Sequence, residues 1–136
     1  MKIWHQYSSE HSANLVMIGH FESVADATKA KEIIDVLTRQ VHEEESSGAL
    51  TIGHPSERYS DEMLDLLGKL NINSIGSSEL EQLVYEVNIE AQGKDLVLTT
   101  EELDISAFLK VMVNKGARVE VYSAHDYPDT AHGRGR

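Results

Sequence analysis

The stretch ANLVMIGHF, residues 13–21, is the most informative part of the sequence. It is a nearly continuous apolar run of strand length, which is typical of a central strand covered on both faces. Ser23 follows it, three residues before the carboxylate of Asp26, and this spacing predicts the start of a helix. The helix carries its apolar residues on one face and is expected to run to about His42. The stretch 43–48 should then end it, and its three acidic side chains should fray the last turn because they oppose the helix dipole at that end.

The same pattern recurs later in the chain. Residues 3–27 align with residues 84–108 without a gap, and aromatic, apolar and helix-capping residues fall at matching positions. The identities are only Leu15 with Leu96 and Val16 with Val97. We interpret the pattern as a duplicated β-β-α-β unit; chance similarity between two ordinary segments is the alternative.

In the first unit, about residues 2–53, strands are predicted at 2–7 and 49–53 in addition to the run at 13–21. The second unit, about residues 83–123, contains two predicted strands joined by a hairpin, a helix and a last strand. These elements are strands at 83–91 and 95–101 around Gln92-Gly93-Lys94, a helix capped by Asp104 and ended by Gly116, and a strand at 117–123. In the last strand, the alternation places Val119 and Val121 inward and Arg118, Glu120 and Tyr122 outward.

The residues between the two units predict further helical structure. Ser60 should cap a connector helix at 60–70, and a helical turn is expected at 77–81, where Ser78 and Glu81 have capping-box spacing.

Together these elements predict a single α+β domain over residues 1–124 with a flexible polar tail at 125–136. We expect a mixed or antiparallel sheet with helices on one face, of ferredoxin-like character. Because the run at 13–21 is apolar on both sides, the second face needs a cover. The connector helix or a second subunit would provide it, and we favour a homodimer.

Composition narrows the classes of function. The 136 residues carry 23 Asp and Glu against 12 Lys and Arg, a net charge of −11. This charge repels phosphate groups, so binding to nucleic acid or to an anionic membrane is disfavoured, whereas a basic protein partner would be attracted. The alternative is that the charge serves solubility alone. With no cysteine, disulfides and thiolate metal sites are excluded. No apolar run is long enough to span a membrane, and the first residues do not resemble a signal peptide, so we expect a soluble cytoplasmic protein.

The densest group of reactive side chains is Tyr7, Ser9, Glu10, His11 and Ser12. Here His11 would be the general base, Ser9 or Ser12 a nucleophile or binding hydroxyl, Glu10 an orienting carboxylate, and Tyr7 a binding or proton-donating group. The alternative is that they are ordinary loop residues that form turn and capping hydrogen bonds.

A metal site would use His5, His11 and His20, with Glu10 as an oxygen ligand. His5 and His20 lie on strands that should pair as a hairpin, but the two residues come opposite each other only if the hairpin turns at residues 12–13. The spacing matches no helical pair of metal ligands, and no glycine-rich phosphate loop is present. We therefore expect no cofactor.

Two functions remain. The first is a small acidic homodimer that binds or inhibits a basic protein, as immunity proteins and antitoxins do. The second is a small enzyme or ligand-binding protein that uses residues 7–12 with His11 as general base. A third, minor alternative is a nucleic-acid mimic, because regularly spaced carboxylates imitate phosphates.

Overall fold

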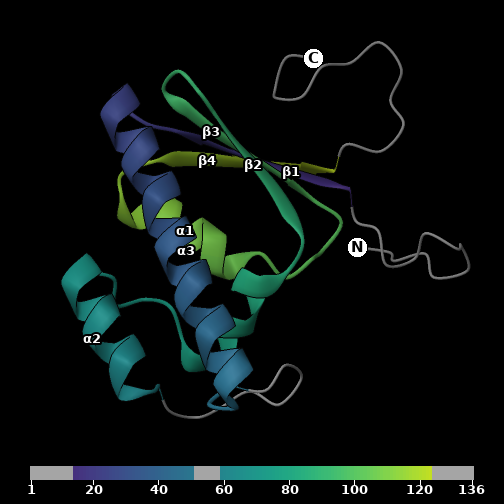
Figure 1. Ribbon diagram of the computed structural model, residues 1–136. Helices are drawn as coiled ribbons and strands as arrows, with labels where there is room; N and C mark the ends of the chain where they lie inside the picture. Colours follow the sequence, from purple (N-terminus) through teal and green to yellow (C-terminus); the bar gives the residue numbers. More distant parts are fainter. Residues whose placement is uncertain (1–13, 51–58, 124–136) are drawn as a thin grey trace, which may run out of the picture.

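A four-stranded antiparallel sheet forms one layer of the computed structural model, which describes residues 14–50 and 59–123 (Figure 1). The strand order is β2-β3-β1-β4. The strands are β1 (Leu15–His20), β2 (Val87–Gln92), β3 (Asp95–Thr100) and β4 (Arg118–Ser123), and the helices are α1 (Val24–Ser47), α2 (Asp61–Leu70), the 3-10 helix η1 (Ser77–Val84) and α3 (Ser106–Asn114). The predicted α+β class is confirmed. In these residues, no helix is both long and apolar enough for a membrane span.

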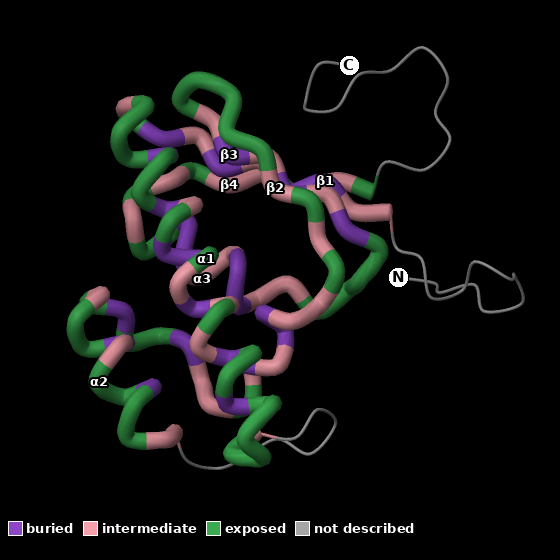
Figure 2. Tube along the Cα trace, viewed as in Figure 1, coloured by how far each residue is buried: buried purple, intermediate pink, exposed green. Residues whose placement is uncertain are grey.

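The core lies between the sheet and the helices, which share one side of it (Figure 2). Met17 of β1 is opposite Leu98 of β3 and Val121 of β4, so alternate residues of these strands face the helices. Gly19 of β1 leaves room for α3, because a Cβ there would lie 2.9 Å from the sulfur of Met112. The apolar run at 13–21 thus forms the strand that was predicted, slightly shorter.

Both edges of β1 are occupied, one by β3 and the other by β4. The predicted hairpin between β1 and residues 2–7 is therefore wrong, since no edge of β1 is left for it. The structure does not describe residues 2–7 or the tail at 125–136. Of the strand expected at 49–53, residues 51–53 also lie outside the described part.

The alignment of residues 3–27 with 84–108 can be compared with the observed elements. It matches β1 with β3, which is its neighbour in the sheet, and it matches α1 with α3.

Helix α1 is longer than predicted. It continues through the acidic run 43–45 to Ser47 and ends at Gly48, which has a left-handed φ of 86°. Glu44 is only 6% exposed, and its carboxylate accepts hydrogen bonds from Gln40 and from the hydroxyl of Ser60, at 2.8 and 2.6 Å. These contacts stabilise the buried carboxylate of Glu44 near the C-terminal end of α1. They explain why the helix continues through the acidic run.

Helix α2 begins as predicted, because the Ser60 hydroxyl accepts the backbone N–H of Met63 at 2.9 Å. Its buried side chains, Met63 and Leu67, belong to the same core as α1. The helix lies on the same side of the sheet as α1 (Figure 1). The alternative in which this helix covers the second face is therefore wrong.

Much of the second half agrees with the sequence analysis. The hairpin of β2 and β3 turns at Gly93, which has a left-handed φ of 63°, and Gly116 follows α3 with a φ of 98°. Val119 packs against the core, while Arg118 and Glu120 lie on the other face. Val121 points to the helix side but is 45% exposed, because it lies on the edge strand.

Three local predictions in the second half are wrong. Residues 83–84 belong to η1, so the strand starts only at Val87. The predicted pairing of Ser78 with Glu81 does not begin η1; instead the carboxylate of Glu79 accepts the backbone N–H of Gly76 at 2.7 Å. Asp104 does not cap α3, which begins at Ser106 after Ile105.

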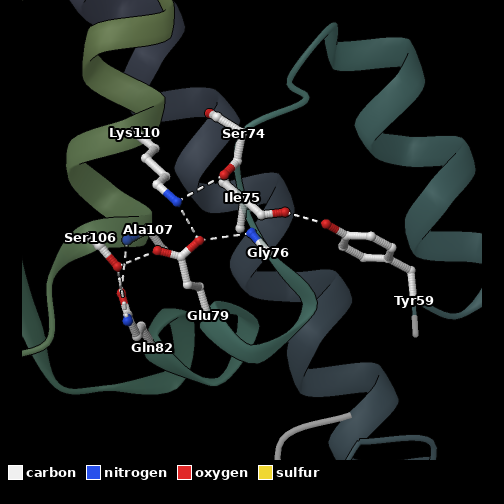
Figure 3. A network of polar contacts seen from close by, with 9 residues as sticks. All are labelled: Tyr59, Ser74, Ile75, Gly76, Glu79, Gln82, Ser106, Ala107 and Lys110. Carbon is white, nitrogen blue, oxygen red and sulfur yellow. Dashed lines mark hydrogen bonds and ion pairs between the residues drawn. The ribbon is translucent and has the colours of Figure 1, made fainter. Parts of the chain in front are cut away.

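A side chain from η1 takes the place of the missing cap of α3 (Figure 3). The Gln82 carbonyl oxygen accepts the backbone N–H of Ala107 at 2.8 Å, and its amide donates to Ser106 at 3.1 Å. Beside it, Glu79 accepts the Ser106 hydroxyl and the Lys110 ammonium, the latter at 2.6 Å. Because each contact joins η1 to α3, this network fixes how the two helices pack.

The network predicts that Gln82→Ala is destabilising. The variant leaves the buried N–H of Ala107 without its partner, which costs about 1–3 kcal/mol of unfolding free energy. Urea unfolding followed by circular dichroism measures it. Gln92→Ala, at an exposed strand position, is the control and should change stability by less than about 0.5 kcal/mol. Equal effects of the two substitutions would show that Gln82 does not cap α3.

Candidate functional site

The face of the sheet opposite the helices, here called the outer face, carries a row of polar side chains at one end. Its side chains on the three neighbouring strands β1, β3 and β4 are Val16, Ile18, His20, Asp95, Val97, Thr99, Arg118, Glu120 and Tyr122. Val16 is buried, and Ile18 and Val97 are half-buried. The apolar part of this face is therefore largely screened from water, while its polar end holds a connected cluster.

His20 is the centre of that cluster. Its Nδ1 lies 2.9 Å from Asp95 Oδ1, and its Nε2 lies 2.8 Å from Glu120 Oε2. Asp95 is the direct partner of His20 on β3, whereas Glu120 is diagonal to it on β4. The other oxygen of Glu120 accepts the hydroxyl of Tyr122. The cluster thus ties the three strands together across the sheet.

The two carboxylates favour the charged form of His20. Burial of the ring acts to lower its pKa, but the hydrogen bonds and negative charges of Asp95 and Glu120 outweigh this effect and raise the pKa above 6.5. When both ring nitrogens carry protons, each donates to one carboxylate. The arrangement is therefore that of an imidazolium held between two anions.

This geometry limits the chemistry of His20. A general base needs a ring nitrogen with a free lone pair, and here both nitrogens face carboxylates. The two carboxylates approach opposite edges of the ring, so the three groups do not converge on one point. Among residues 14–50 and 59–123, no group of three or more side chains has the geometry of a metal site.

A shallow hollow of about 400 Å³ lies beside the cluster, lined by His20, Arg118, Val119 and Glu120. Arg118 is exposed and has no hydrogen-bond or ion-pair partner among the residues that the structure describes. The acidic side chain two residues along the same strand, Glu120, is instead bonded to His20 and Tyr122. Within the described part of the chain, the cluster therefore leaves the guanidinium of Arg118 unpaired.

The site predicted from the sequence is not part of the described structure. Tyr7, Ser9, Glu10, His11 and Ser12 fall outside the described residues, as does His5, so their role as an enzyme site stays a prediction. The paired strands on which the His5–His20 metal site depended do not form, since β3 and β4 occupy both edges of β1. Sequence reasoning finds His20 but misses Asp95 and Glu120.

The raised pKa of His20 predicts a pH-dependent contribution to stability. Because the folded pKa lies above the unfolded value, the stabilisation is complete below about pH 6.5 and is lost as the pH rises through the folded pKa. His20→Gln should therefore lower the melting temperature more at about pH 6, where the wild-type ring is protonated, than at about pH 9, where it is neutral. Differential scanning calorimetry measures both.

The control is His42→Gln, since His42 lies on α1 with 58% of its side chain exposed, 3.9 Å from Glu45. It should change the melting temperature little at either pH, because exposed ion pairs contribute little. A difference between wild type and His20→Gln that is constant across the pH range would contradict an imidazolium at position 20.

Comparison with known proteins places nearly the whole sequence in one family. The profile of the family of unknown function DUF6375 matches residues 1–134. Searches of curated proteins and of solved structures found no match. Since the matched region includes both described parts and nearly all of the chain, the protein belongs to the family of unknown function DUF6375.

Proposed function

We propose that this protein is a non-enzymatic binding module of the inhibitor or immunity type, which acts as a homodimer and recognises a basic protein. The net charge of −11 supports a basic partner, because opposite charges steer association and suppress wrong partners. The engaged ring of His20 also supports binding over catalysis, since both of its nitrogens already face carboxylates.

We also propose a ferredoxin-like topology for the domain. If α2 and η1 are set aside as insertions, the element order is β-α-β-β-α-β. The antiparallel order β2-β3-β1-β4 is compatible with two β-α-β halves that interlock in one sheet. The adjacent positions of β1 and β3, each followed by a helix, support a duplication in which β1-α1 corresponds to β3-α3.

One surface feature carries the proposal of a protein partner. Leu103 is 65% exposed, more than any other large apolar side chain described, and it lies between Glu102 and Asp104. The surroundings of Leu103 are negatively charged. Burial and the negative charges of Glu81, Asp104 and Glu102 raise the pKa of the nearby Tyr85. We call Tyr85, Glu102, Leu103 and Asp104 the Leu103 patch.

The chemistry of the Leu103 patch fits a partner with a basic rim around an apolar pocket. The exposed leucine would be the anchor that enters the pocket, and the acidic side chains around it would pair with lysine or arginine. An apolar contact of this kind adds affinity that charge alone does not provide, and it would survive at moderate salt. The charged contacts would set the association rate and its dependence on salt.

The test compares two exposed leucines. The full-length protein, immobilised at low salt, is expected to retain a basic protein from the lysate of its own cells, and the retained protein is then purified and titrated back by calorimetry. Leu103→Ser should weaken binding about tenfold, the effect of losing about 1.4 kcal/mol. Leu64→Ser, which changes a leucine that is 53% exposed on α2, should leave the affinity unchanged.

Two results would overturn the proposal. One is that no basic protein is retained at low salt. The other is that the purified partner binds both variants with the same affinity as wild type, which would exclude the Leu103 patch as the binding surface.

A further inference from the structure

Strand β4 has one edge that no other described strand occupies. It is the last strand in the order β2-β3-β1-β4 and pairs only with β1, through all six of its residues. In the part of the chain that the structure describes, no strand lies beyond it. Its outer edge therefore presents backbone N–H and C=O groups that another strand can pair with.

This edge lacks several of the features that normally prevent such pairing. The strand reads RVEVYS, with no proline and no lysine, and its register with β1 runs without a bulge. Val121 is 45% exposed, and it is the one large exposed apolar side chain among the described strands. The other edge strand, β2, exposes the polar residues Asn88, Glu90 and Gln92 instead.

The charges along β4 are self-complementary. Arg118 and Glu120 lie on the same face of the strand, two residues apart, and Arg118 has no partner in the described ranges 14–50 and 59–123. If a second β4 pairs antiparallel to the first about a two-fold axis at Val119, each Arg118 faces a Glu120. Residues that face each other in an antiparallel pair interact directly, and opposite charges stabilise the pair.

We propose that the homodimer forms through the free edge of β4, which pairs antiparallel with β4 of a second copy so that Arg118 lies opposite Glu120 of the partner subunit. The two sheets then continue into one sheet of eight strands. The inference rests on the homodimer of the proposed function and names the surface that forms it. The pairing gives Arg118 an acidic partner and covers residues 118–120 of the edge, while residues 121–123 of each copy extend past β4 of the partner subunit.

Other registers of the same two-fold pairing fit less well. If the axis passes through Glu120, the two copies of this residue face each other, and like charges directly opposite are destabilising. If it passes through Val121, Glu120 faces Tyr122 of the partner subunit, so Arg118 gains no acidic partner. The chosen register is compatible with the His20 cluster, because the carboxylate of Glu120 has acceptor sites beyond those used by His20 and Tyr122.

The test uses two charge-reversed variants, Arg118→Glu and Glu120→Lys, measured alone and mixed. Each variant alone places like charges opposite each other and should weaken self-association at least tenfold in sedimentation equilibrium. Mixing them restores opposite charges at both contacts, because the two reversed side chains face each other at one contact and the two native side chains face each other at the other. A heterodimer should therefore form with an affinity near that of the wild-type homodimer. Circular dichroism confirms that each variant is folded before mixing.

The matched control is Glu90→Lys, which makes the same charge change on the outer face of the other edge strand, β2, and should leave the dimer intact. The results separate this inference from the proposed function. A wild-type dimer that neither single variant weakens overturns the β4 interface and leaves the homodimer standing, and so does a mixture that stays monomeric. A monomeric wild type overturns both the interface and the homodimer, whereas binding of a basic protein is decided by the leucine variants.

Discussion

The antiparallel pairing of β1 with β3 on one edge and β4 on the other is the constraint on which the rest of the structure depends. It places Met17 among core side chains on one face and His20 beside carboxylates on the other. A shift of one residue in either register would exchange the two faces, burying the charged side chains and exposing the apolar ones. The same pairing leaves no edge of β1 free, so that β2 and β4 are the outermost strands among the residues that the structure describes.

The outer face stabilises itself more than its apolar residues suggest. Val16 is buried, and the polar end is a cluster whose positive imidazolium is matched by Asp95 and Glu120. A face of this kind has less need of a cover than a uniformly apolar one. Of the large apolar side chains that are exposed in the described residues, none belongs to the outer face: Val121 points to the helix side of β4, Leu103 lies in the connection before α3, and the others lie on helices. This distribution favours contacts through edges and loops over stacking of two sheets.

Local signals in the sequence predict the elements better than the partners of each element. The apolar run at 13–21 and the Ser60 cap each have a local physical cause, and the structure contains the strand and the helix that they predict. The errors arise where a distant residue decides the outcome, as where Gln82 replaces Asp104 as the cap of α3. The candidate site shows the same limit, because the partners of His20 depend on the order of strands in the sheet, which periodicity alone does not give. Its contact with Asp95 spans 75 residues of sequence, and no local pattern marks it.

The long range of these contacts has a consequence for how the chain is made. His20 contacts residues that are 75 and 100 positions further along, so β1 leaves the ribosome well before either of its neighbours exists. Helix α1 forms from local contacts, but the strand before it stays unpaired until β3 and β4 have been synthesised. During that interval its apolar side chains are exposed to other nascent chains. Completion of the fold therefore depends on β4, which follows all the other described strands in the sequence, and truncation before β4 would leave an aggregation-prone intermediate.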